Sequence, residues 1–242
     1  MSTLVAPDVE QGLASLTRDL TAALGADLVG VALYGGLAKG RYTPGISDVN
    51  VLVVIRRTEL QLLERVAGPL TAARRSHRIV ALVVAPEDLQ RMADVFTVKI
   101  ADIKAAHRVL HGSIPIANVE INPRMLVLRV RQQLANMELR ARNEAIIHAD
   151  DPEALWRHIT QALPKIAVTL ETVLRVPGVA IPSDRPGILR RASELLEAPE
   201  LSEFADLHRH TQRPPDEEVR RLAGIWLGLF EKLELAVERL LQ

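Results

Sequence analysis

Hydrophobic positions divide the first half of the chain into short apolar runs and amphipathic segments. The apolar runs have the length of strands and span residues 28–34, 48–55, 78–84 and 108–112. Segments with apolar residues at helical spacing span residues 8–24, 58–75, 86–92 and 93–107. Alternation of these two patterns predicts an α/β or α+β domain over residues 1–115, built on one central sheet. Because the second and third runs barely alternate, we expect both faces of their strands to be buried.

The second half of the chain has a different pattern, without a run typical of a strand. Amphipathic segments follow one another over residues 122–149, 150–176, 184–197 and 215–241. We therefore expect an all-helical bundle over residues 119–242. Pro69 and Pro164 fall inside predicted helices, where proline removes a backbone hydrogen bond, so each should bend or interrupt its helix.

Composition narrows the classes of function. The 242 residues contain 30 Lys and Arg against 30 Asp and Glu, so the net charge near zero argues against a nucleic-acid binder. The absence of cysteine excludes a disulfide framework, a thiolate zinc site and a cysteine nucleophile. Neither a signal peptide nor a membrane-spanning run stands out, so we expect a cytoplasmic protein without a membrane partner. The oligomeric state stays open.

A glycine-containing stretch, LYGGLAKGRYTPGISDVNVLVVI at residues 33–55, carries the chemistry. The stretch is typical of a strand, a turn, a loop and a second strand. Gly35 and Gly36 permit a tight turn and close approach of a ligand to the backbone. One helical turn after them would direct backbone N–H groups at an anion, and Lys39 adds a positive charge. This pattern predicts a phosphate-binding turn.

Two polar side chains begin the second strand of that stretch. Asp48 and Asn50 are two residues apart, so on a strand they share one face, and Ser47 precedes them. A phosphate-binding turn beside paired metal-binding side chains is typical of a phosphoryl or nucleotidyl transferase. In such enzymes two divalent ions activate the attacking hydroxyl and neutralise the leaving pyrophosphate.

The motif resembles that of the polymerase-beta-like nucleotidyltransferase superfamily, which has Gly-Ser, a glycine-containing turn and Asp-x-Asp on the next strand. The match covers residues 28–84. The whole chain resembles bacterial nucleotidyltransferase-domain proteins that are distantly like aminoglycoside nucleotidyltransferases. The resemblance implies a mixed-sheet minimal nucleotidyltransferase domain followed by a helical domain, with Mg²⁺ and ATP or another nucleoside triphosphate as cofactors. It implies nucleotide binding at Gly35, Gly36, Lys39, Ser47 and Asp48, and metal binding at Asp48 and Asn50.

The chain also departs from this motif. Gly36 replaces the family serine, and Asn50 replaces the second aspartate. The third family carboxylate should come from the strand 78–84, near Ile79, where every candidate position is apolar; Glu87 and Asp88 lie just beyond that strand. One missing charge at contact distance weakens attraction to a cation by roughly several kcal/mol at an effective dielectric of about 20.

These departures favour a catalytically degraded member that binds a nucleotide or another anionic ligand, or that serves as an interaction module. The alternative is an active magnesium-dependent transferase that moves a nucleoside monophosphate to a small hydroxylated acceptor, with Asp48 holding Mg²⁺ and Asn50 assisting. In a third interpretation the helical bundle binds a partner and the first domain is only a scaffold.

Weaker candidates lie elsewhere in the chain. Arg142 and His148 faintly resemble the motif of HEPN ribonucleases, although a solvated helix end explains them as well. His208 and His210 form the one close histidine pair, but at this spacing on a helix they point apart. Arg56 and Arg57, just past the second strand, are candidates for phosphate contact.

Overall fold

The computed structural model describes residues 7–42, 47–175, 179–207 and 213–239. The chain divides into two compact units, residues 1–121 and 122–242. Each unit has its own core, and each is described by itself below.

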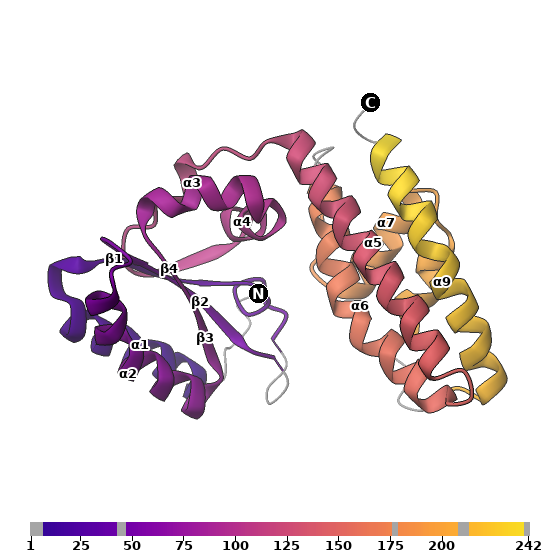
Figure 1. Cartoon of the computed structure of the whole chain (residues 1–242), viewed down its shortest axis with the longest axis horizontal. Coiled ribbons are helices and arrows are strands. Elements are labelled where there is room, and N and C mark those ends of the chain that lie inside the picture. Colours follow the sequence, from indigo (N-terminus) through magenta and orange to yellow (C-terminus); the bar gives the residue numbers. More distant parts are fainter. Residues whose placement is uncertain (1–6, 43–46, 176–178, 208–212, 240–242) are drawn as a thin grey trace. The chain divides into compact units, whose positions relative to one another are not determined.

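The first unit contains a four-stranded sheet with helices on both faces (Figure 1). Its elements are α1 (Pro7–Leu24), β1 (Leu28–Tyr34), β2 (Val49–Ile55), α2 (Leu60–His77), β3 (Ile79–Val84), α3 (Pro86–Val95), α4 (Thr97–Ala105) and β4 (His107–Gly112), with 3-10 turns at Gly25–Asp27 and Pro115–Asn118. The strand order is β3-β2-β1-β4. Because β1 is antiparallel to β2 and β4 whereas β2 is parallel to β3, the sheet is mixed, which confirms the predicted fold class.

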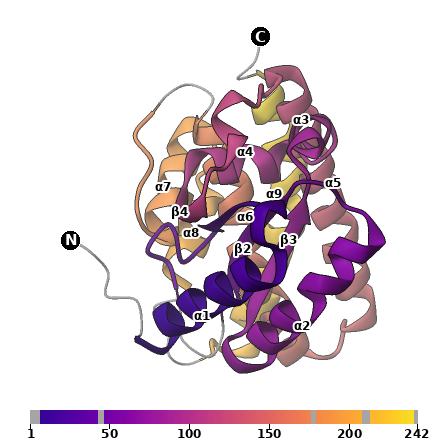
Figure 2. The ribbon, with the colours of Figure 1, turned by 90° about the vertical axis from the view of Figure 1, so that its left-hand side faces the viewer.

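Alternate residues of the central strand pack on opposite faces of this sheet. Val51 and Val53 face the core formed with α1 and α2, which run side by side along the sheet (Figure 2). Leu52 and Val54 face the core formed with α3 and α4. All four side chains are fully shielded from solvent. The predicted burial of both faces is therefore confirmed for this strand. For β3 the same prediction is wrong: residues 80–83 are only partly buried, because β3 lies at the edge of the sheet.

Two glycines face each other where β1 meets β4. Gly30 and Gly112 are cross-strand partners. A Cβ atom on Gly30 would lie 2.3 Å from the carbonyl oxygen of Ser113, and one on Gly112 would lie 2.1 Å from that of Val29. Because these distances are far below van der Waals contact, neither position accepts a side chain without moving the backbone.

All the regular secondary structure described in the second unit is helical. Its helices are α5 (Pro123–Ile147), α6 (Pro152–Arg175), α7 (Arg185–Leu195), α8 (Glu200–Leu207) and α9 (Asp216–Arg239). Trp226 packs edge-on against Phe204 and Phe230, with ring centroids 5.1 Å apart in both pairs. The short helix α8 was not predicted. Helix α2 continues through Pro69 and α6 through Pro164, so neither helix is interrupted at its proline.

Within the described parts of the chain, no helix is both long enough and apolar enough to cross a membrane.

Candidate functional site

The strand register brings the predicted site residues to one edge of the sheet. β1 ends at Tyr34, which is the cross-strand partner of Asn50 near the start of β2. β3 begins beside it, since Val49 is paired with Ile79 and Asn50 with Val80. The end of β1 and the beginnings of β2 and β3 therefore meet at this edge. We call residues 35–41 the glycine turn and residues 47–50 the β2 head.

The glycine turn is a compact backbone loop. Gly35 has a φ of +77°, a left-handed conformation that side chains disfavour. The N–H groups of residues 39, 40 and 41 donate to the carbonyl oxygens of residues 35, 37 and 36, at 3.2, 3.0 and 2.7 Å respectively. None of these three bonds uses the N–H groups of residues 36–38, which are the groups that an anion at the turn would meet.

Gly35 also lies against the β2 head. A Cβ atom at this position would be 3.2 Å from Nδ2 of Asn50, so the missing side chain lets the amide approach the turn. A Cβ atom on Gly36 would be 3.2 Å from the carbonyl oxygen of Arg41. A side chain at either position would therefore push its neighbour by a few tenths of an ångström, and at Gly35 it would also meet the left-handed backbone. The partly buried Asn50 amide borders the place where a ligand of the turn would sit.

Lys39 contacts a carboxylate rather than extending into solvent. Its ammonium group is paired with Asp102 of α4, and the two side chains are only 6% and 14% exposed. Tyr34 lies close to this pair and is itself buried. Burial raises the pKa of the Tyr34 hydroxyl, and the negative charge of Asp102 raises it further. Tyr34 therefore stays neutral and keeps its hydroxyl proton at neutral pH.

Asp48 is likewise paired with a basic side chain. Nη2 of Arg78 donates to Oδ1 of Asp48 at 2.9 Å, and both side chains are about half exposed. The two segments are also joined through the backbone, because the N–H of Val49 donates to the Arg78 carbonyl at 3.1 Å. Ser47, partly buried, precedes Asp48 in the chain.

The register corrects the expected position of a third carboxylate. Ile79 is paired with Val49 and packs in the core with α1 and α2, on the opposite face from Asn50. The residue beside Asn50 on the same face is Val80, which is partly buried. A one-residue shift along a strand turns a side chain to the other face, so an alignment to Ile79 points away from the site. The position that faces Asn50 is apolar.

Other charged candidates lie at the far edge of the sheet. Glu87 and Asp88 follow the end of β3, which at six residues spans about 20 Å from the β2 head. Asp88 accepts a hydrogen bond from the Ala85 N–H at 2.9 Å and so caps α3. Arg56, just past β2, is also at that far edge and bonds to the Ala26 carbonyl at 2.9 Å. None of these side chains reaches Asp48.

The metal-binding part of the motif does not fit a two-metal centre. Asp48 is the one carboxylate at the β2 head, Asn50 brings no charge, and Val80 offers no ligand atom. Across the described residues, no group of three or more His, Asp or Glu side chains is arranged to hold a metal ion. We therefore derive no catalytic step through Mg²⁺ at this site.

The weaker candidates are accounted for separately. Arg142 is paired with Glu138, and Nε2 of His148 lies 3.4 Å from a carboxylate oxygen of Glu144. Each is a pair of residues one helical turn apart, the first within α5 and the second at its C-terminal end, rather than a joint Arg–His site. His208 and His210 lie outside the described residues.

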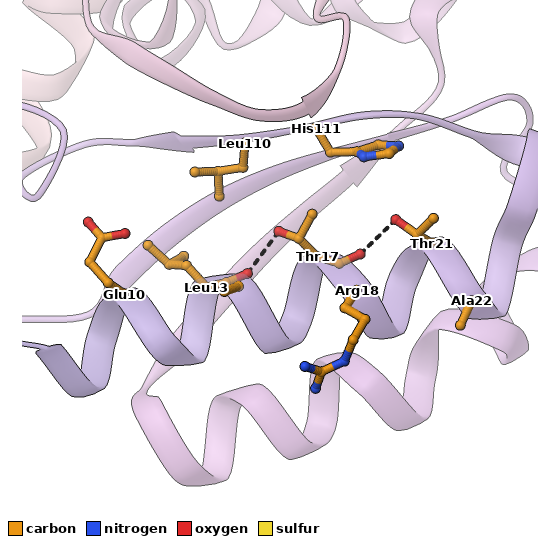
Figure 3. Close-up of a pocket in the computed structure, with 9 residues that line it drawn as sticks. Glu10, Leu13, Thr17, Arg18, Thr21, Ala22, Leu110 and His111 are labelled. Carbon is orange, nitrogen blue, oxygen red and sulfur yellow. Dashed lines mark hydrogen bonds between the residues drawn. The ribbon is translucent and has the colours of Figure 1, made fainter.

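A groove with a volume of about 710 Å³ lies on the other face of the sheet, between α1 and β4 (Figure 3). The hydroxyl groups of Thr17 and Thr21 donate to backbone carbonyls of α1 at 2.8 Å, and Glu10 is paired with Arg108. The Thr17 and Thr21 hydroxyl groups and the Glu10 carboxylate therefore have partners within the chain.

Comparison with known proteins adds a fold assignment. No family model and no curated protein matches the sequence. Among solved structures, the chain is similar to spectinomycin adenyltransferase AAD(9) from Enterococcus faecialis, solved with ATP and spectinomycin. The TM-score is 0.57 at 11% identity, covering 95% of this chain and 99% of that one. The chain has a nucleotidyltransferase-like fold. The resemblance suggested by the sequence is thereby confirmed for the fold.

A second solved structure is a nucleotidyltransferase-like protein from Exiguobacterium sibiricum 255-15. It is 13% identical, with coverage of 96% of this chain and 78% of that one and a TM-score of 0.41. A similarity at this TM-score carries no argument about the chain.

Four features of the candidate site were not predicted from the sequence. Arg78 is the partner of Asp48, and Asp102 is the partner of Lys39. Tyr34 is the buried neighbour of Asn50, and Val80 is the side chain that faces it. One signal was available: the helix ending at His77 meets a strand two residues later without Gly or Asn between them. Such a junction forces another residue into the left-handed conformation, which here is Arg78.

Proposed function

We propose that the first unit binds a nucleotide, or another phosphate-bearing anion, between the glycine turn and the β2 head, without catalysing two-metal nucleotidyl transfer. The observation that carries this proposal is the pairing of Asp48 with Arg78 beside an apolar Val80. A two-metal centre needs clustered carboxylates to hold its cations. At the β2 head Asp48 is the one carboxylate, and Arg78 already balances its charge.

The glycine turn supports phosphate as the ligand group. Its closing bonds use N–H groups 39–41 and leave those of residues 36–38 outside the bonding pattern of the turn. Successive backbone N–H groups in a tight turn form a concave site for anions, and Gly36 allows an oxygen to approach the backbone. The neutral Tyr34 hydroxyl and the Asn50 amide border the same edge, where each can offer a hydrogen bond.

ATP is the first nucleotide to test. The adenyltransferase with a similar fold was solved with ATP, and its likeness extends over nearly all of both chains. At 11% identity this likeness supports the fold and selects a probe. It does not carry over the acceptor of that enzyme.

The proposal is tested by calorimetric titration of the whole chain with ATP and with GTP. The variant Gly35→Ala should weaken binding strongly, because the new Cβ atom combines left-handed strain with a 3.2 Å contact to the Asn50 amide. Gly25→Ala is the matched control: its φ is +54°, but no atom lies within 4 Å of the added Cβ, and it is at the opposite end of β1. Equal loss in both variants, or no binding by the native chain, contradicts the proposal.

The active transferase is the second candidate function, favoured by the whole-chain likeness to an adenyltransferase. It would require Mg²⁺ at Asp48. Release of pyrophosphate from ATP in the presence of Mg²⁺ and small hydroxylated acceptors, lost in Asp48→Ala, would replace binding by transfer as the function. The interaction module and the scaffold interpretations predict no nucleotide binding in any of these titrations.

A further inference from the structure

Arg78 has a backbone conformation that is costly for its residue type. Its φ is +53°, and it follows α2 as the left-handed C-terminal cap. In the described chain, only Glu197 shares a positive φ among non-glycine residues. Glycine or asparagine is the usual residue at such a cap, because Cβ strains the left-handed conformation. A strained residue beside a candidate site suggests that its side chain has a function there.

Backbone hydrogen bonds hold Arg78 in this conformation, and its guanidinium lies at the β2 head. The backbone N–H of Arg78 donates to carbonyl groups of the last turn of α2, and its carbonyl accepts from Val49. With both sides of the residue anchored, the side chain reaches Asp48 at 2.9 Å. In a metal-dependent site, the carboxylate would instead contact a divalent cation. Here any cation would have to displace a guanidinium from Asp48, and the second position of the motif is the uncharged Asn50.

We infer that this site takes a phosphate group without a divalent metal, and that Arg78 supplies the positive charge that a metal would otherwise provide. This inference rests on the proposed function. A guanidinium carries five N–H donors in a planar fork, a geometry that suits the oxygens of a phosphate as well as those of a carboxylate. Charge-assisted bonds from arginine to phosphate are among the stronger hydrogen bonds in proteins. Asp48 then acts as a positioning residue that orients Arg78.

Magnesium should oppose this mode of binding. Mg²⁺ coordinates the phosphate oxygens of ATP and lowers their negative charge, which weakens their attraction to a guanidinium. Binding that depends on clustered carboxylates has the opposite dependence, because the metal then bridges protein and phosphate. The sign of the magnesium effect therefore distinguishes the two.

The experiment is calorimetry on the whole chain with ATP and with inorganic tripolyphosphate, each in EDTA and in excess Mg²⁺. We expect ATP to bind in EDTA at least as tightly as with Mg²⁺. Arg78→Gly should weaken binding in EDTA about tenfold or more, as expected for loss of a charge-assisted bond. Arg78→Lys should recover part of the affinity. Binding of tripolyphosphate identifies the phosphate chain as the ligand group, whereas binding of ATP alone means that the nucleoside is also recognised; metal independence in either case supports the inference.

Glu197→Gly is the matched control, since it relieves the same backbone strain in the second unit and should leave binding unchanged. Arg78→Gly is expected to fold because glycine favours the cap conformation. ATP binding that requires Mg²⁺ would overturn the inference but keep the proposed function. Binding by Arg78→Gly equal to that of the native chain would do the same. Absence of binding by the native chain under all conditions overturns both.

Discussion

Lys39 and Asp102 form an ion pair that is almost entirely shielded from water. The side chains are 6% and 14% exposed, and the pair joins the glycine turn to α4 across 63 residues of sequence. A turn held in this way is ordered before any ligand arrives, so less conformational entropy is lost on binding. The pair is also a point at which the stability of the first unit can be measured.

Removal of one partner of this pair should be costly. Asp102→Asn leaves the Lys39 ammonium buried without a countercharge, and the free energy of unfolding should fall by about 3 kcal/mol. Replacement of both residues, Lys39→Met with Asp102→Leu, should restore most of the loss because no buried charge remains. Urea unfolding followed by far-UV circular dichroism measures both variants. A double variant as unstable as Asp102→Asn would contradict this explanation.

The fluorescence of tryptophan provides an internal control for that measurement. Trp156 and Trp226, the two tryptophans of the chain, both lie in the second unit. Tryptophan fluorescence therefore reports the helical unit, whereas circular dichroism reports both. A substitution at Lys39 or Asp102 should therefore lower the urea concentration of the transition seen by circular dichroism more than that of the transition seen by tryptophan fluorescence.

Substitution by glycine at the two left-handed residues, Arg78 and Glu197, should affect stability differently. Glu197→Gly relieves a left-handed conformation at an exposed residue and should stabilise the chain by about 1 kcal/mol. Arg78→Gly relieves the same strain but loses the half-exposed pair with Asp48, which contributes between 0 and about 1 kcal/mol. Its gain should therefore be smaller. Thermal unfolding of both variants under identical conditions tests this order, and a large loss of stability in Arg78→Gly would show that the pair matters more than the strain.

A magnesium site should appear when the missing carboxylates are supplied. Asn50→Asp with Val80→Asp places three carboxylates, including Asp48, on one face at the β2 head. Their mutual repulsion should lower the melting temperature without metal. Binding of Mg²⁺ at tenfold above its dissociation constant would return about 1.4 kcal/mol.

The native chain should show no such magnesium-dependent rise. Asn50→Asp with Ala81→Asp is the matched control, because residue 81 points to the opposite face of β3. Thermal unfolding with and without Mg²⁺ separates the two double variants. An equal response in both would mean that the carboxylates need not share a face, against the geometry described above.

High pH should destabilise the first unit through Tyr34. Burial and then Asp102 raise the pKa of this hydroxyl above the unfolded value near 10. Between the two pKa values the folded state holds the proton more tightly, so its contribution is complete below about pH 10 and is lost as the pH rises further. Tyr34→Phe should reduce this loss, whereas Tyr42→Phe should keep it because Tyr34 is intact. Urea unfolding by circular dichroism between pH 8 and pH 11 measures the difference.

The strands of this fold were predictable because burial determines their composition. The run at residues 48–55 became β2, and its lack of alternation followed from two buried faces. The short helix α8 was missed because it has only two turns between a left-handed residue, Glu197, and the described end of that segment at Leu207. Pro69 does not interrupt α2, which continues through it to His77.

The candidate site was only partly predictable, for reasons of distance and register. The sequence located Gly35, Asp48 and Asn50 because they are close along the chain. It could not pair Lys39 with Asp102, which is remote in sequence. It also placed the third position at Ile79 rather than Val80, since the face of a strand changes with each residue.

The facing glycines of β1 and β4 restrict which sequences can adopt this sheet. Gly30 and Gly112 each lie against a backbone carbonyl of the neighbouring segment, and neither contact involves the nucleotide motif. A chain that has lost or exchanged its phosphate chemistry must still keep both, or lengthen the separation of the two strands. A search for distant relatives that gives weight to this glycine pair would therefore find proteins of this fold that a search for the Asp-x-Asp motif overlooks.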